Sequence, residues 1–185
     1  MRLSIVTFGS EGDTRPLAAL CRGLLDHGHD LKLFAEQSTL SLPRRFGVPC
    51  EALPGDVQST LPIADPKQEI RLADVISTTK AMKAILATHT GAWLRIVAAH
   101  ARESDAILFS SLAYGVGAAL REELNKPAIG LWFQPITPTR AFCSPMIPPM
   151  KLPGWANLLT YRLLHRQIWS FCGESTQAAR GEVFG

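Results

Sequence analysis

A short segment with two carboxylates follows the first apolar run of the chain. The run covers residues 3–8, and the next segment, 9–16, reads Gly-Ser-Glu-Gly-Asp-Thr-Arg-Pro. A dinucleotide-binding loop has the pattern G-x-G-x-x-G, whose middle glycine lets a pyrophosphate approach the start of a helix. This segment lacks that pattern, and the carboxylates of Glu11 and Asp13 would repel a phosphate. The segment therefore favours a neutral ligand, and it places Asp13 where a carboxylate can take a proton from a hydroxyl.

Asp13 also has a structural interpretation. Asp and Thr side chains accept hydrogen bonds from the first turn of a helix, so Asp13 or Thr14 could cap the helix that follows. From the spacing alone, capping is favoured over catalysis, although one residue can serve in both ways. Ser10 has two similar options, because its hydroxyl can bond to the helix start or to a hydroxyl of a ligand.

Further candidates follow two later apolar runs. Ser110 and Ser111 come after the run 105–109, so we expect them at the same edge of the sheet as Asp13, where they contact a ligand or cap the next helix. Phe133 and Gln134 come at the end of the last apolar run. Aromatic residues are more often part of a core, whereas Gln134 in an apolar stretch suggests a polar contact.

The segment 134–153 has six prolines and little periodicity, and it is too long to be a mere connector. It carries Met146 among several apolar side chains. Such side chains on a loop suit an adaptable apolar pocket, and packing over the sheet edge is the alternative.

The elements that must position these residues alternate along the chain. Short apolar runs predict strands at 3–8, 30–35, 50–53, 105–109 and 128–132. Helical periodicity predicts a helix after Pro16 that Gly28 ends, and further helices at 37–46, 68–102 with a break at Gly91, 114–124, 155–171 and 174–184. This alternation predicts an α/β fold: a doubly wound, Rossmann-like α/β/α sandwich with a mainly parallel sheet.

Two stretches carry a resemblance to a known family. The first is G-S-x-G-D-x-x-P at 9–16 with Gly-His at 28–29, and the second is Leu-Trp-Phe-Gln-Pro-Ile-Thr-Pro-Thr-Arg at 131–140 with the prolines that follow as far as 155. At these residues the chain resembles the inverting glycosyltransferases of the two-Rossmann (GT-B) fold. The similar branch contains the bacterial, antibiotic and sterol enzymes related to the UDP-glycosyltransferases.

The resemblance implies that residues 1–185 form the N-terminal, acceptor-binding domain of such an enzyme. Many relatives have a histidine base in a G-H-x-x-P segment, and Asp13 stands in that place here. The implied acceptor is a lipophilic alcohol or phenol, such as a sterol, lipid, polyketide or other natural product. The residues implied to contact it are Ser10, Gly12, Ser111, Phe133, Gln134 and Met146.

The resemblance also implies a donor that this chain does not hold. The family grips the diphosphate of its nucleotide-sugar, expected to be UDP-linked, with a His-x-Gly-x-Gly-Thr type segment, which does not occur here. We therefore expect the donor on a separate C-terminal domain, no cofactor and no metal. An alternative is a non-catalytic module of the same fold that binds an apolar ligand or a partner protein.

Composition narrows the setting. A net charge of +3 with no basic run argues against nucleic acid, and four scattered cysteines without a C-x-x-C pair indicate neither a zinc nor a redox site. The sequence contains no run of about eighteen apolar residues, the length that would predict a transmembrane helix. The N-terminal apolar run is too short for a signal peptide. We expect a cytoplasmic protein, and this expectation is compatible with peripheral contact with a membrane.

Overall fold

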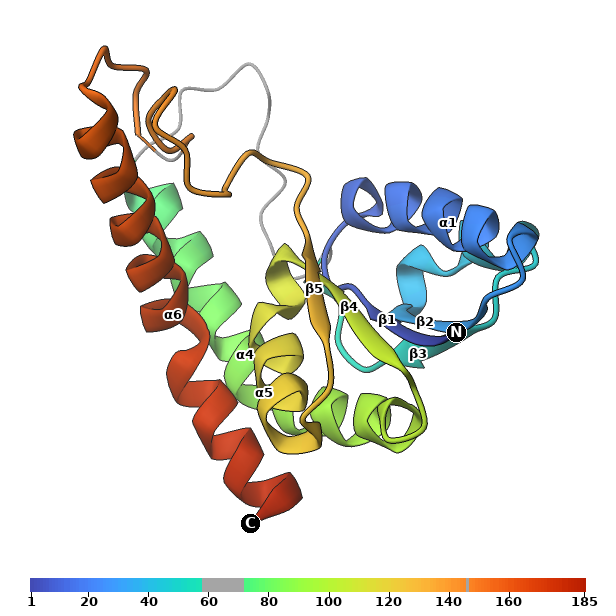
Figure 1. Ribbon diagram of the computed structural model, residues 1–185. Helices are drawn as coiled ribbons and strands as arrows, with labels where there is room; N and C mark the ends of the chain where they lie inside the picture. The colour runs from blue at the N-terminus through green and yellow to red at the C-terminus, as the bar shows by residue number, and fades with distance from the viewer. Residues whose placement is uncertain (58–71, 146) are drawn as a thin grey trace.

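Among the described residues, the sheet has five strands that all run in the same direction. The computed structural model describes residues 1–57, 72–145 and 147–185 (Figure 1). The strands are β1 (Arg2–Val6), β2 (Asp30–Glu36), β3 (Cys50–Leu53), β4 (Ala106–Ser110) and β5 (Ala128–Leu131), in the order β3-β2-β1-β4-β5. The chain passes from β3 at one edge to β4 on the other side of β1, so the strand order reverses between β1 and β4. In such sheets the carboxyl ends of the strands at the reversal form a crevice.

Helices cover both faces of the sheet, which confirms the predicted α/β/α sandwich (Figure 1). On one face, Leu3 and Ile5 of β1 share a core with Leu17 and Cys21 of α1 (Glu11–Asp26), and the short α2 (Ser41–Arg45) lies beside α1. The other face carries α4 (Leu72–Ala101), α5 (Tyr114–Leu124) and α6 (Gly154–Phe184). The single-turn 3-10 segments Gln37–Thr39 and Ser111–Ala113 complete the elements of the described residues.

The core on the second face is the larger one. Val6, the last residue of β1, and Phe8, which follows the strand, pack with the buried Trp93 and Leu94 of α4. Because successive residues of β1 point to opposite faces, its run is apolar on both faces apart from Ser4, as expected of a strand that is covered on both sides.

Two features of the predicted helices differ from the structure: the start of the first helix at Pro16 and the break at Gly91. Pro16 lies inside α1, because Ser10 caps that helix earlier in the chain. α4 continues through Gly91, since buried residues on either side of it, Leu86 and Trp93, pack against the same core. The predicted start of this helix at residue 68 lies outside the described residues.

The chain closes with one helix where two were predicted. α6 runs uninterrupted through Gly173, whose cost in a helix interior is about 1 kcal/mol. Cys172 before it and Thr176 and Ala179 after it are all buried, and this packing outweighs the cost. None of the helices in the described ranges is both long and apolar enough to cross a membrane.

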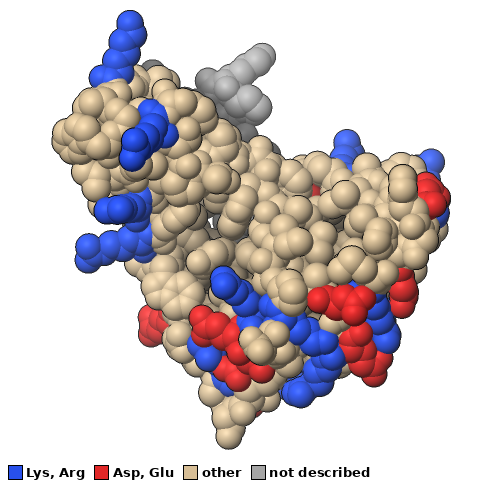
Figure 2. All heavy atoms as spheres, viewed as in Figure 1, with Lys and Arg blue, Asp and Glu red and all other residues tan. Residues whose placement is uncertain are grey.

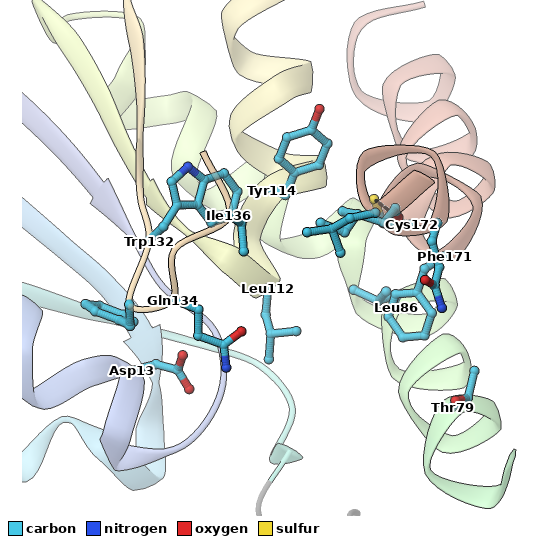
Figure 3. A pocket seen from close by; sticks show the side chains of 14 residues that line it. Asp13, Thr79, Leu86, Leu112, Tyr114, Trp132, Gln134, Ile136, Phe171 and Cys172 are labelled. Atoms are coloured by element: carbon cyan, nitrogen blue, oxygen red, sulfur yellow. Dashed lines mark hydrogen bonds between the residues drawn. The ribbon is translucent and has the colours of Figure 1, made fainter. Parts of the chain in front are cut away.

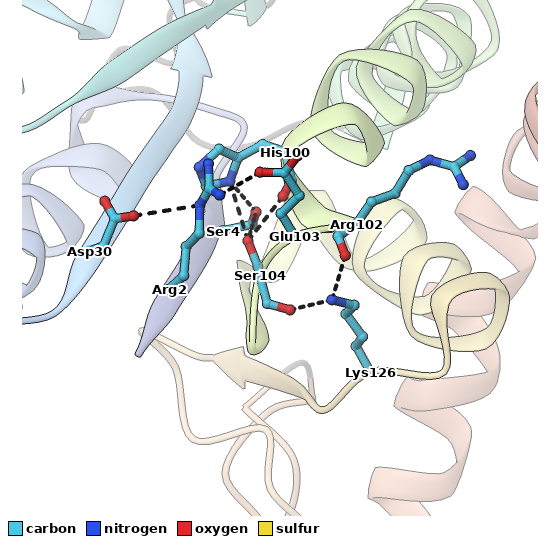
Figure 4. Close-up of polar contacts among 8 residues, drawn as sticks. All are labelled: Arg2, Ser4, Asp30, His100, Arg102, Glu103, Ser104 and Lys126. Carbon is cyan, nitrogen blue, oxygen red and sulfur yellow. Dashed lines mark hydrogen bonds and ion pairs between the residues drawn. The ribbon is translucent and has the colours of Figure 1, made fainter.

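Polar contacts hold the amino-terminal edge of the sheet together (Figure 4). The hydroxyl of Ser4 in β1 lies 2.8 Å from Nδ1 of His100 in α4 and 2.9 Å from the hydroxyl of Ser104. Lys126, before β5, donates to the carbonyl of Arg102 at 2.7 Å and also to that of Ser104. These contacts join β1 and the start of β5 to the end of α4 and the residues that follow it.

Candidate active site

A cleft of about 460 Å³ opens at the carboxyl edge of the sheet (Figure 3). Its walls come from the start of α1, from α4, from the segment that enters α5, from the residues after β5 and from α6. The lining is mainly apolar, with Leu112, Tyr114, Trp132, Ile136, Ile168 and Phe171 among its members. In the view of Figure 3, Asp13 and Gln134 lie on one side of the cleft, with Leu86 and Phe171 across from them.

Asp13 is held by the capping of α1. Ser10 is the residue that caps the helix, and its hydroxyl oxygen accepts from the backbone N–H of Gly12 at 3.2 Å. Asp13 occupies the third helical position and completes a capping box, because its Oδ2 accepts from the backbone N–H of Ser10 at 3.1 Å and from its hydroxyl at 3.3 Å. The capping interpretation of Asp13 is thus met in part: Ser10 rather than Asp13 or Thr14 is the N-cap residue, and Asp13 takes part in the capping from the third helical position. Both bonds from Ser10 are made to Oδ2, while the carboxyl group also lines the cleft.

Gly9 allows Asp13 to fold back in this way. Its φ of +133° lies in a region that residues with a side chain rarely adopt, and a Cβ there would come within 2.5 Å of Oδ2 of Asp13. The glycine of the sequence pattern thus serves the approach of the carboxylate to the turn rather than the approach of a phosphate.

The surroundings of Asp13 raise its pKa. Burial is the largest cause, because a charged carboxylate loses hydration beside the apolar lining, and the hydrogen bonds from Ser10 act in the opposite direction. A carboxylate with a raised pKa is a stronger base than an ordinary aspartate, which suits proton transfer from a hydroxyl.

A second carboxylate, which the sequence did not single out, lies at the end of β2. Glu36 is fully buried, and both of its carboxylate oxygens accept from the backbone N–H of Val57, at 3.1 and 3.2 Å. Burial raises its pKa to about 7; the negative charges of Asp56 and Asp13 add to the rise, and the bond from Val57 opposes it. The available signal was an acidic residue directly after a buried apolar strand.

The structure brings three of the predicted site residues to the cleft: Asp13, Phe133 and Gln134. Ser10 and Gly12 form the turn behind Asp13 and are not part of the lining. The side chain of Ser111 and all of Met146 lie outside the described residues. The roles predicted for these residues in contacting an acceptor stay predictions.

The wall formed by α6 was missed at the sequence level. Leu164, Ile168 and Phe171 line the cleft, but in the sequence they are ordinary members of a closing helix. By contrast, Phe142 and Met150 of the proline-rich loop, which seemed suited to a pocket, are exposed and lie outside the cleft. Within the described ranges, no group of three or more His, Cys, Asp or Glu side chains could hold a metal ion.

Curated relatives match the chain over most of its length. It is 25% identical to the sterol 3-beta-glucosyltransferase of Neurospora crassa over 187 residues, which cover 100% of the chain and 12% of that protein. It is 25% identical to the UDP-sugar-dependent glycosyltransferase 52 of Dictyostelium discoideum, over 91% of the chain and 10% of that protein. The chain thus spans about an eighth of the curated relatives it matches. No family model matches the chain.

Solved structures share the fold. The glycosyltransferase SnogD from Streptomyces nogalater superposes with a TM-score of 0.60 at 15% identity, over 100% of this chain and 42% of that one. The glycosyltransferase VinC, solved in complex with DTDP, gives a TM-score of 0.53 at 14% identity, over 97% of this chain and 44% of that one. The chain has the fold of a GT-B glycosyltransferase domain and is similar along its length to part of the sterol 3-beta-glucosyltransferases, which confirms the resemblance predicted from the sequence.

Proposed function

We propose that the chain is the acceptor-binding domain of an inverting glycosyltransferase that moves a sugar from a nucleotide-sugar to a hydroxyl of a lipophilic acceptor. The observation that carries the proposal is the position of Asp13, a carboxylate with a raised pKa in a mainly apolar cleft. Such a cleft binds an apolar body, and Asp13, the one carboxylate among the described residues of the lining, is available to the hydroxyl of that body.

Asp13 is the general base in this proposal. It accepts the proton of the acceptor hydroxyl while the oxygen attacks the anomeric carbon of the sugar. The new bond joins the acceptor oxygen to that carbon, the bond from the carbon to the diphosphate breaks, and the nucleoside diphosphate leaves with the electron pair. A single displacement of this kind inverts the anomeric centre. Gln134, beside Asp13 in Figure 3, is placed to hold the acceptor hydroxyl by a hydrogen bond.

The nucleotide-sugar is held by a second domain in this proposal. α1 begins at the cleft, and its first turn carries Glu11 and Asp13, which disfavour a diphosphate at that helix start. The name of the Dictyostelium relative supports a UDP-sugar as the donor, and the sterol glucosyltransferases support a sterol or similar lipid alcohol as the acceptor.

Ligand titration of the chain tests whether it binds the acceptor and leaves the nucleotide-sugar to a second domain. A sterol delivered from cyclodextrin should bind, and UDP-glucose should show no affinity tighter than about 1 mM, or roughly −4 kcal/mol. Ile168→Trp, which fills the cleft, should abolish sterol binding. Ser170→Trp, on an exposed position of the same helix, should leave it unchanged. Tight binding of UDP-glucose, or equal sterol binding by both variants, would contradict the proposal.

A further inference from the structure

A long stretch of the sequence has basic residues and no acidic ones. Residues 124–173 contain neither Asp nor Glu, although the chain as a whole is nearly balanced in charge. Within this stretch the exposed cations are Arg140 and Lys151 in the proline-rich loop and Arg162 and Arg166 in α6. The lobe at the upper left of Figure 2, which the loop and the start of α6 form, shows basic and uncharged residues but no acidic ones on the visible face.

Large apolar side chains are exposed on the same lobe. Trp155 is 67% exposed and Leu163 is 65% exposed, and Phe142, Met150 and Leu159 are each exposed by more than two fifths. Soluble surfaces carry single exposed apolar residues routinely, but a cluster of them marks a binding surface. We call this set, together with the four cations, the basic-apolar tip.

The helical part of the tip is a single stripe. At 3.6 residues per turn, one sector of roughly 100° of α6 contains Trp155, Leu159, Arg162, Leu163 and Arg166. The opposite side carries Asn157, Tyr161 and Leu164, which are all buried. The exposed stripe is therefore not an incidental edge of the core. It is a second apolar side of the helix, interleaved with arginines.

The cations of the tip have no ion-pair partner among the described residues. At the other end of the same helix, Arg180 is paired with Glu122 and Glu123, both at 2.6 Å. One end of α6 thus neutralises its charge within the fold, and the other presents its charge outward.

We propose that the basic-apolar tip docks on the surface of an anionic lipid bilayer. Interfacial helices combine Trp, Phe and Leu on the side that enters the bilayer with Lys and Arg that attract anionic headgroups. A nucleic acid would use the cations and could stack on Trp155, but it offers nothing to the aliphatic side chains of Leu159 and Leu163. A bilayer contacts both kinds of group, which is why it is the occupant favoured here.

Docking of this kind would place the cleft next to a source of lipid. The inner side of α6 contributes Leu164 and Ile168 to the cleft, so one helix faces both the proposed membrane and the pocket. A smaller cavity of about 150 Å³, lined by Pro138 and His165, shares Trp132 and Ile168 with the cleft. The delivery of an acceptor from the bilayer to the cleft rests on the proposed function. The docking of the tip on the bilayer does not.

Vesicle sedimentation with the chain tests the docking. Vesicles of phosphatidylcholine with phosphatidylserine should bind it at low salt, and vesicles of phosphatidylcholine alone should bind it far more weakly. The double substitution Arg162→Gln with Arg166→Gln should lower the partition coefficient roughly 10- to 30-fold. Leu163→Ser should lower it several-fold through the lost apolar contact. Circular dichroism should show that each variant keeps its helix content, since the altered side chains are exposed.

Matched controls lie on the other face of the sheet. Arg44→Gln with Arg45→Gln on α2, and Leu20→Ser on α1, remove the same groups from other exposed positions and should change partitioning less than about twofold. Equal losses in the controls, equal binding to neutral vesicles, or no vesicle binding would overturn the proposal. Self-association without vesicle binding would assign the tip to a second copy of the chain. None of these outcomes bears on sterol or UDP-glucose titration, so the two proposals fail separately.

Discussion

One carboxylate lies in the first turn of the helix that follows β1 and another at the end of the neighbouring strand β2, and the two have different surroundings. Asp13 follows β1 and lines the cleft, and Glu36 ends β2 and is completely buried. Burial is the largest cause of a raised pKa in both. Asp13 is compensated by two hydrogen bonds from Ser10, whereas Glu36 has the single N–H of Val57, shared by both of its oxygens.

The difference shows that a shifted pKa does not by itself mark a reactive group. Glu36 has a pKa of about 7, but its oxygens are occupied by a backbone N–H and no substrate can reach them. Asp13 combines a raised pKa with a position in the wall of the cleft. This difference supports the proposed role of Asp13 as the base and a structural role for Glu36, which ties β2 to the segment after β3.

The largest expected effect is on catalysis at Asp13. In an enzyme that joins this chain to a nucleotide-sugar-binding domain, Asp13→Asn should lower the rate constant for transfer to an alcohol by roughly 10²- to 10⁴-fold. The amide oxygen can still accept from Ser10, so folding and acceptor affinity should change little. Steady-state kinetics would measure the rate. Glu36→Gln is the control at the other strand end and should cost less than about tenfold, because no substrate contacts it. A folded Asn variant with near-normal turnover would show that the base lies elsewhere.

The next effect is the pH dependence of stability that Glu36 introduces. Its pKa rises from an ordinary 4.5 to about 7 in the folded chain, so between these pH values the folded state binds more protons than the unfolded state. The free energy of unfolding should therefore fall as pH rises through this window, and the loss from Glu36 should approach about 3 kcal/mol at most.

Urea unfolding at pH 5 and pH 8 would measure this dependence. Glu36→Gln keeps an oxygen that accepts from Val57 but has no proton to lose, so its free energy of unfolding should fall less between the two pH values. Asp13 also has a raised pKa and contributes in the same direction, so the comparison of variant with wild type isolates the share of Glu36. An identical fall in both proteins would mean that Glu36 titrates normally.

Two regular elements and the two carboxylates show how much the sequence can predict. β3 at Cys50–Leu53 has the predicted bounds because prolines flank its apolar pattern, and α5 at Tyr114–Leu124 also has the predicted bounds, ending at Asn125 in a left-handed conformation. Asp13 was identifiable because its glycine-containing segment follows a strand directly. Glu36 was not, since the effect of its burial depends on Val57 and Asp56, which arrive from another strand end.

Contacts between distant segments also hid the far wall of the cleft. Ile168 and Phe171 reach the pocket only because α6 packs along α4 and α5, and nothing local distinguishes them from core residues. Likewise, the local pattern predicts a helix boundary at Gly173. The structure has none there, because Cys172 and Thr176 on either side of it are buried and hold α6 continuous. Local patterns predicted the elements, and the residues that long-range packing brings together remained hidden.

The smallest effect is expected from a substitution of Ser10, the N-cap residue of α1 that holds Asp13 in place. Ser10→Ala removes a hydroxyl that accepts from the N–H of Gly12 and donates to Asp13, but it leaves the backbone bond from residue 10 to Asp13 in place. Loss of the cap should lower the free energy of unfolding by about 1 kcal/mol. Because the lost hydroxyl lowers the pKa of Asp13, that pKa should rise further, and the pH at which proton acceptance begins should move upward. Thr88→Ala is the control: its exposed hydroxyl only donates to a carbonyl within α4, so both quantities should stay unchanged. Urea unfolding and the acidic limb of the pH–rate profile would measure them. If Ser10→Ala weakened the fold but left that limb in place, the titrating group in catalysis would not be Asp13, and the contrast drawn between the two strand ends would fail at its first member.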